Sequence, residues 1–137
     1  MNTDTDTDRR VADAQAELAE EHAALHALVE RVRGCSDAQA LAGLLDELHR
    51  RLFVHFGHEE YPGGLYDRMG VISASYRDRV RALADDHFRL LSEIRGLARQ
   101  AKSGGDGVVA EAQRLAGVLR EHEDREQALA DAARHGS

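Results

Sequence analysis

Apolar residues recur at spacings of three and four along the chain, which is the period of an amphipathic α-helix. Leu18, Leu25 and Val32, for example, share one face of the first such stretch, and charged residues fill the opposite face. Similar stripes predict four helices in all, over about residues 8–33, 37–60, 73–102 and 108–136. A chain with this period throughout is expected to be all-α.

Short breaks separate these stretches. Gly34 ends the first, Tyr61-Pro62-Gly63-Gly64 ends the second, and an irregular turn then leads to Ser73 or Ser75 as the cap of the third. Residues 103–107 form a glycine-rich loop before the last helix. Short connections favour an up-down-up-down four-helix bundle. Residues 1–8 are a polar Asp/Thr run after Met1, so a disordered acidic tail is expected before a single domain at residues 9–137.

Composition narrows the class of protein. The chain of 137 residues has 4% aromatic residues, no tryptophan and one proline, which favours helices over strands. Its net charge of -7 argues against nucleic acid or an anionic membrane surface as a partner. No apolar stretch approaches the length of a membrane span, the N-terminus lacks the features of a signal peptide, and Cys35 has no cysteine to pair with. We therefore expect a cytoplasmic protein, either a monomer or a weak homodimer.

Histidine and glutamate recur with one spacing in both halves of the chain. His55 and Glu59 stand four residues apart, as do His122 and Glu126, so each pair lies on one helix face. Leu18-Ala19-Glu20-Glu21-His22 also matches Leu83-Ala84-Asp85-Asp86-His87. The repeated unit predicts two helical hairpins related by a pseudo-two-fold axis, with six side chains converging between them.

A dinuclear metal site accounts for this pattern. His22, His55, His87 and His122 all fall on apolar stripes, where a polar group without a partner costs about 1 to 3 kcal/mol. Coordination by imidazole nitrogen and carboxylate oxygen removes that cost and suits iron, manganese or zinc. A zinc-filled or metal-free structural module is less consistent with two ligand groups, since tetrahedral zinc takes four ligands at one ion.

The order His22, His55-x-x-x-Glu59, His87, His122-x-x-x-Glu126 resembles the hemerythrin-like (HHE cation-binding) family, from about Val11 to His135. The resemblance implies two non-haem iron ions, bridged by Glu59, Glu126 and an oxo or hydroxo group, with the histidines as terminal ligands. Oxygen-carrying members place another histidine one turn after the first on the third helix, where this chain has Leu91.

Other residues are candidates for completing the site. His26 follows His22 by one turn and is either a further ligand, a neighbour of the ligands or a rim residue. His58 borders the site, whereas His49 and His135 are expected to be solvated. Tyr66 is either a phenolate ligand, a radical-quenching neighbour or a packing residue. We expect the pocket around the metals to be lined by Leu52, Phe56, Phe88, Leu91 and Leu119.

The expected function follows from a site with an open position. A dry pocket admits dioxygen, peroxide, nitric oxide or azide as the small ligand and excludes most organic substrates. One hypothesis is a diiron oxidoreductase with peroxidase or catalase-like turnover or nitric oxide handling. The alternative is reversible binding, storage or sensing of dioxygen without turnover. Leu91 favours the first hypothesis because a less saturated iron lets peroxide react, whereas ligation by His26 would favour the second.

Overall fold

The computed structural model describes the backbone of residues 3–135 and the side chains of residues 6–135. Five helices follow one another: α1 (Thr3–Gly34), α2 (Ala38–Glu60), α3 (Leu65–Gly70), α4 (Ala74–Lys102) and α5 (Val108–Arg134). No strand occurs within residues 3–135. The all-α prediction is therefore confirmed.

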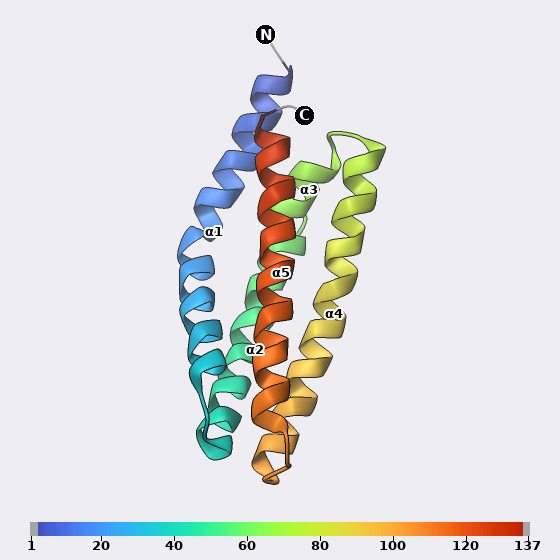
Figure 1. Ribbon diagram of the computed structural model, residues 1–137. Helices are drawn as coiled ribbons and strands as arrows, with labels where there is room; N and C mark the ends of the chain where they lie inside the picture. The colour runs from blue at the N-terminus through green and yellow to red at the C-terminus, as the bar shows by residue number, and fades with distance from the viewer. Residues whose placement is uncertain (1–2, 136–137) are drawn as a thin grey trace.

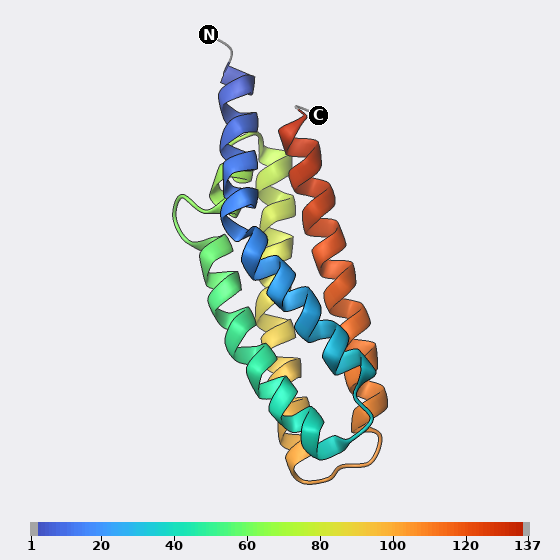
Figure 2. The same cartoon turned by 90° about the vertical axis from the view of Figure 1, so that its left-hand side faces the viewer.

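The four long helices form an up-down-up-down bundle (Figure 1). α1 and α4 run away from the end that carries both termini, and α2 and α5 run back towards it, as Figure 2 also shows. α2 packs most extensively against α4, and α1 against α5. Each helical hairpin thus lies against the other, which confirms the predicted bundle.

Local capping explains where these helices begin. The side chain of Asp37 accepts hydrogen bonds from the backbone N–H groups of Gln39 and Ala40 at the start of α2. Ser73 accepts one from Tyr76 at the start of α4. Both caps satisfy backbone donors that have no partner within the helix. Ser73, and not Ser75, is therefore the cap of the third long helix.

Two segments differ from the sequence prediction. The expected irregular turn contains a short helix, α3, because Leu65, Tyr66 and Met69 are buried against the end of the bundle. α1 already begins at Thr3, so the backbone of residues 3–8 is helical where the sequence predicts a tail. Aspartates in the first turns of a helix stabilise it by facing its positive end. Residues 1–2 of the predicted tail lie outside the described residues.

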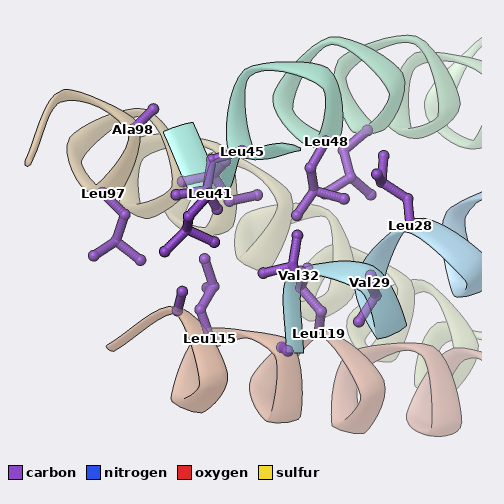
Figure 3. Packing of buried hydrophobic residues seen from close by; sticks show 14 of the residues in the cluster. Leu28, Val29, Val32, Leu41, Leu45, Leu48, Leu97, Ala98, Leu115 and Leu119 are labelled. Carbon is purple, nitrogen blue, oxygen red and sulfur yellow. The ribbon is translucent and has the colours of Figure 1, made fainter. Parts of the chain in front are cut away.

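The apolar core consists of two clusters. The larger fills the half of the bundle away from the termini, where leucines and valines of all four long helices point towards one another (Figure 3). The smaller surrounds α3 and includes Leu18, Leu83 and Leu129. His22 lies between Leu18 and Leu25, and His87 between Leu83 and Leu90, so each histidine stands where its helix passes from one cluster to the other. The six candidate ligands therefore interrupt the core at this boundary.

Candidate metal centre

All six candidate ligands lie on the inner faces of the four long helices. His55, Glu59, His87, His122 and Glu126 are at most 5% exposed. The side chain of His22, on α1, is 28% exposed and forms the solvent side of the group. Carboxylates and imidazoles are rarely buried to this degree without charge partners or a metal.

The first group contains His22, His55, Glu59 and Glu126, whose potential ligand atoms all lie within 4.8 Å of one another. His22 Nε2 lies 3.5 Å from Glu59 Oε2 and 3.4 Å from Glu126 Oε1. His55 Nε2 lies 3.2 Å from Glu59 Oε2. Two imidazoles and two carboxylates thus surround one small volume.

The second group contains His87, His122 and Glu126, so Glu126 is common to both groups. His87 Nε2 lies 3.1 Å from His122 Nε2 and 3.5 Å from Glu59 Oε1. The hydroxyl of Tyr66 donates to Glu126 Oε2 at 2.7 Å and lies 2.8 Å from His87 Nε2. The structure therefore brings Tyr66, from α3, into direct contact with two candidate ligands.

Hydrogen bonds within the protein do not satisfy these groups. Neither carboxylate oxygen of Glu59 has a hydrogen-bond partner among the described residues, although this side chain is fully buried. His122 Nδ1 has none either. A buried carboxylate left in this way costs more than the 1 to 3 kcal/mol typical of a neutral group. Bound cations would remove that cost, so the residues present fit a metal centre.

The family comparison agrees with this geometry. Residues 13–130 match the model of the hemerythrin HHE cation-binding domain. The chain belongs to the hemerythrin family. No curated protein and no solved structure matches it. Within the part of the chain that the structure describes, no helix of this hemerythrin domain is long and apolar enough to cross a membrane.

Charge divides the site of this hemerythrin domain into two unlike halves. Burial opposes protonation of His22, but the carboxylates of Glu126 and Glu59 raise its pKa to about 10. In the metal-free protein a protonated His22 therefore supplies the positive charge between the two carboxylates. Burial lowers the pKa of His87 and of His122, which keeps both rings neutral, the form in which imidazole binds metals.

Two further ionisable groups at the centre, Glu126 and Tyr66, remain protonated more readily than usual. Burial and the adjacent Glu59 carboxylate raise the pKa of Glu126, because two neighbouring carboxylates resist ionising together. Burial and the charges of Glu59 and Glu126 raise the pKa of the Tyr66 phenol. Tyr66 is thus a hydrogen-bond donor in the metal-free protein.

Two of the additional candidates do not reach the centre. His26 is exposed and belongs to neither ligand group. The side chain of His58 is 53% exposed, and its Nδ1 lies 2.6 Å from Glu21 Oε2, so it contacts a neighbour of the site and no ligand. His49 is half-buried and His135 exposed, both outside the two groups. Tyr66 is the additional candidate that the structure places at the ligands.

The predicted pocket lining is partly wrong. Leu52, Phe56 and Leu119 line a small, partly open cavity of about 10 Å³ between the ligands, together with Val29 and Glu123. Phe88 is 77% exposed and points away, because one residue beyond His87 is turned by roughly 100° around the helix. Leu91 is half-buried and packs against the larger core cluster.

Sequence analysis gave no role to a set of carboxylates that contact the Nδ1 atoms of the histidines. Glu21 lies 2.8 Å from His55 Nδ1, and Glu60 lies 2.9 Å from His87 Nδ1. Asp86 lies 3.6 Å from His122 Nδ1. Two of them, Glu21 and Asp86, stand at equivalent positions of the internal repeat, and that repeat is the signal that could have identified them.

Proposed function

We propose that this protein binds a pair of non-haem iron ions and reacts with peroxide, dioxygen or nitric oxide in a catalase- or peroxidase-like manner. The observation that carries the proposal is the pair of ligand groups that share Glu126, with Glu59 buried and lacking a hydrogen-bond partner in residues 6–135. His22 and His55 would hold one ion and His87 and His122 the other, with Glu59 and Glu126 between them. When bound, the iron pair would supply two-electron redox chemistry towards a small oxidant.

The cavity supports a very small substrate. Its volume of about 10 Å³ is close to the room that a single water molecule needs. Leu52, Phe56 and Leu119 contribute apolar walls, and the ring of Phe56 stacks on His87 with ring centres 3.6 Å apart. Such walls exclude bulk water and most organic molecules. The small volume and apolar walls therefore favour a diatomic molecule or peroxide over an organic substrate as the ligand.

An incomplete ligand set favours turnover over simple carriage. Leu91 takes the position where oxygen carriers are expected to have a further histidine, and it packs into the core. His26 does not replace it, because that side chain is exposed. Among the additional candidates, Tyr66 is the one that contacts the second ligand group, with its hydroxyl 2.8 Å from His87 Nε2. We therefore propose Tyr66 as the residue that donates to Glu126 and orients the second ligand group.

Reversible dioxygen binding is the second candidate function. The apolar cavity favours it, since a dry pocket protects a bound dioxygen molecule from protons that would promote its reduction. The two functions differ in whether the ligand leaves unchanged.

The test is the response of the iron-loaded protein to hydrogen peroxide, followed with an oxygen electrode. Sustained release of dioxygen by the wild type, lost in His122→Ala and kept in His26→Ala, is the expected result. The His26 variant is the matched control because it removes an exposed imidazole outside both ligand groups. Absence of turnover together with reversible spectral changes under dioxygen would instead support the carrier.

A further inference from the structure

The internal repeat extends beyond the six ligands. An acidic residue directly precedes the first histidine of each half, as Glu21 before His22 and as Asp86 before His87. A basic or imidazole side chain directly precedes each ligand glutamate, as His58 before Glu59 and as Arg125 before Glu126. Each half of the chain therefore contains an acidic residue followed by histidine, and later a histidine followed after two residues by a basic or imidazole side chain and glutamate.

In the first half these additional residues contact one another and a ligand. Glu21 Oε1 lies 2.8 Å from Nδ1 of His55, and Glu21 Oε2 lies 2.6 Å from Nδ1 of His58. The contacts join α1 to α2. The side chain of His55 is 4% exposed, whereas those of Glu21 and His58 are 35% and 53% exposed. One carboxylate thus connects a buried ligand with a histidine at the surface.

The second half repeats this arrangement between α4 and α5. Asp86 Oδ2 lies 3.6 Å from Nδ1 of His122 and 3.2 Å from Nη2 of Arg125. Its other oxygen accepts a hydrogen bond from Arg89. Asp86 corresponds to Glu21 and Arg125 to His58, so the pseudo-two-fold axis relates the neighbours of the ligands as well as the ligands.

We infer that Glu21 and Asp86 are a duplicated pair of positioning residues: Glu21 holds His55 with Nε2 directed into the metal centre, and Asp86 has the corresponding, weaker role at His122. This inference rests on the proposed metal-binding function. An ionised carboxylate can only accept hydrogen bonds, so the nitrogen facing it must carry the proton. In a neutral ring the lone pair is then on Nε2. Nε2 of His55 faces Glu59, and Nε2 of His122 faces His87.

Ordinary surface ion pairs do not explain these contacts. The neighbouring acids Glu20 and Asp85, at matched positions of the repeat, are exposed and have no partner within the described residues. Glu21 differs because its carboxylate lies 2.8 Å from Nδ1 of the buried His55 and 2.6 Å from Nδ1 of His58. The same repeat therefore contains one acid per half that contacts the site and one that does not.

The two halves differ in how firmly they hold the histidine. Glu21 reaches His55 at 2.8 Å, whereas the shorter Asp86 remains 3.6 Å from His122, whose Nδ1 has no hydrogen bond within the described residues. Loss of Glu21 should therefore have the larger effect. Asp86, also held by two arginines, should contribute less to the orientation of its histidine.

The first experiment uses the metal-free protein and nitrogen-15 NMR of its histidine rings. In the wild type, Nδ1–H of His55 should appear as a resonance protected from exchange with solvent. Glu21→Ala should lose that protection, and Glu20→Ala should keep it. His58→Ala, which frees Glu21 without removing it, should weaken the protection in part. Equal protection in Glu21→Ala and the wild type, or none in either, would overturn the inference.

The second experiment measures Co²⁺ affinity by titration of the visible bands. Glu21→Ala should bind roughly 10- to 100-fold more weakly than the wild type, with the number of bound ions unchanged at saturation. Glu21→Gln, which keeps an acceptor oxygen, should recover part of the loss. Wild-type affinity in Glu21→Ala would refute a positioning role. Should the wild type bind no Co²⁺, the proposed metal function would fail, while the NMR experiment would still decide whether Glu21 orients His55.

Discussion

Replacing Glu59 by glutamine should stabilise the metal-free protein while removing a ligand of the proposed two-ion centre. Glu59→Gln keeps the size of the side chain, so no cavity forms, and it removes one of two adjacent buried carboxylates. Neither oxygen of Glu59 accepts a hydrogen bond among the described residues, and its charge is compensated only by His22 at 3.5 Å and His55 at 3.2 Å. The new amide can donate to Glu126, whose carboxylate lies in the same ligand group. The native glutamate therefore makes the metal-free protein less stable than an uncharged side chain would, as is common at functional sites.

The size of the effect follows from the penalty on the buried group. Leaving a buried polar group without hydrogen bonds costs about 1 to 3 kcal/mol, which is the upper limit of the expected gain in the free energy of unfolding, because Glu59→Gln also removes the charge pairs with His22 and His55. For a domain of this length that gain corresponds to a rise in Tm of roughly 3 to 15 °C. His22 keeps Glu126 as a charge partner at 3.4 Å, so its own stabilisation is only partly lost.

The assay compares urea unfolding of chelator-treated wild type and Glu59→Gln, together with their metal content after reconstitution. Glu121→Gln is the control, because it removes one charge from an exposed position of α5 and should change stability by less than about 0.5 kcal/mol. A metal-free Glu59→Gln protein less stable than the wild type, with full metal content after reconstitution, would refute the reasoning.

Three further predictions concern single residues. The pKa of His22 is about 10 in the folded metal-free protein against an ordinary 6.5, so its stabilising charge is fully present below pH 6.5 and is lost as the pH rises through about 10. The urea concentration at the unfolding midpoint of the metal-free wild type should therefore fall over that range. A rise would contradict the assignment. Tyr66→Phe removes the hydroxyl that contacts His87 and Glu126 and should lower the stability of the metal-free protein by about 1 to 3 kcal/mol, measured by thermal unfolding; an unchanged Tm would show that the hydroxyl is not needed there. His26→Ala should leave metal content by elemental analysis unchanged, and a lost ion would make His26 a ligand.

The bundle was predictable because its signals are local. Apolar stripes with the helical period, the Asp37 and Ser73 caps and the glycine-rich loop each act within a few residues. The short helix α3 was not predictable, because its stability comes from burial of Leu65 and Met69 against the rest of the bundle. A helix of this length has little stability by itself, and its sequence carries little helical signal.

The candidate site was predictable to the extent that spacing along a helix fixes a face. His55 with Glu59, and His122 with Glu126, share a face by geometry alone, and the structure brings them together. His26 shares the face of His22 as well, but His22 is already 28% exposed, so the next turn of α1 lies outside the centre. How far each helix is rotated about its own axis depends on tertiary packing, which spacing does not reveal.

The contacts of Glu21 and Tyr66 belong to the same unpredictable class. Glu21 on α1 reaches a histidine on α2, and Tyr66 reaches α4 and α5 from a segment expected to be irregular. Phe88 shows the converse error, since a hydrophobic residue beside a ligand is not necessarily near the metal. Only the relative placement of helices distinguishes these cases.

The most direct test of the central claim is the number and identity of metal ions bound per chain. The wild type would be reconstituted anaerobically with Fe²⁺, separated from free metal and analysed by elemental mass spectrometry beside Glu59→Gln. About two iron ions per wild-type chain, falling towards one or none in the variant, is the predicted result. A single ion per chain, zinc alone from the expression host, or equal iron in both proteins would contradict a paired iron centre built on Glu59 and Glu126.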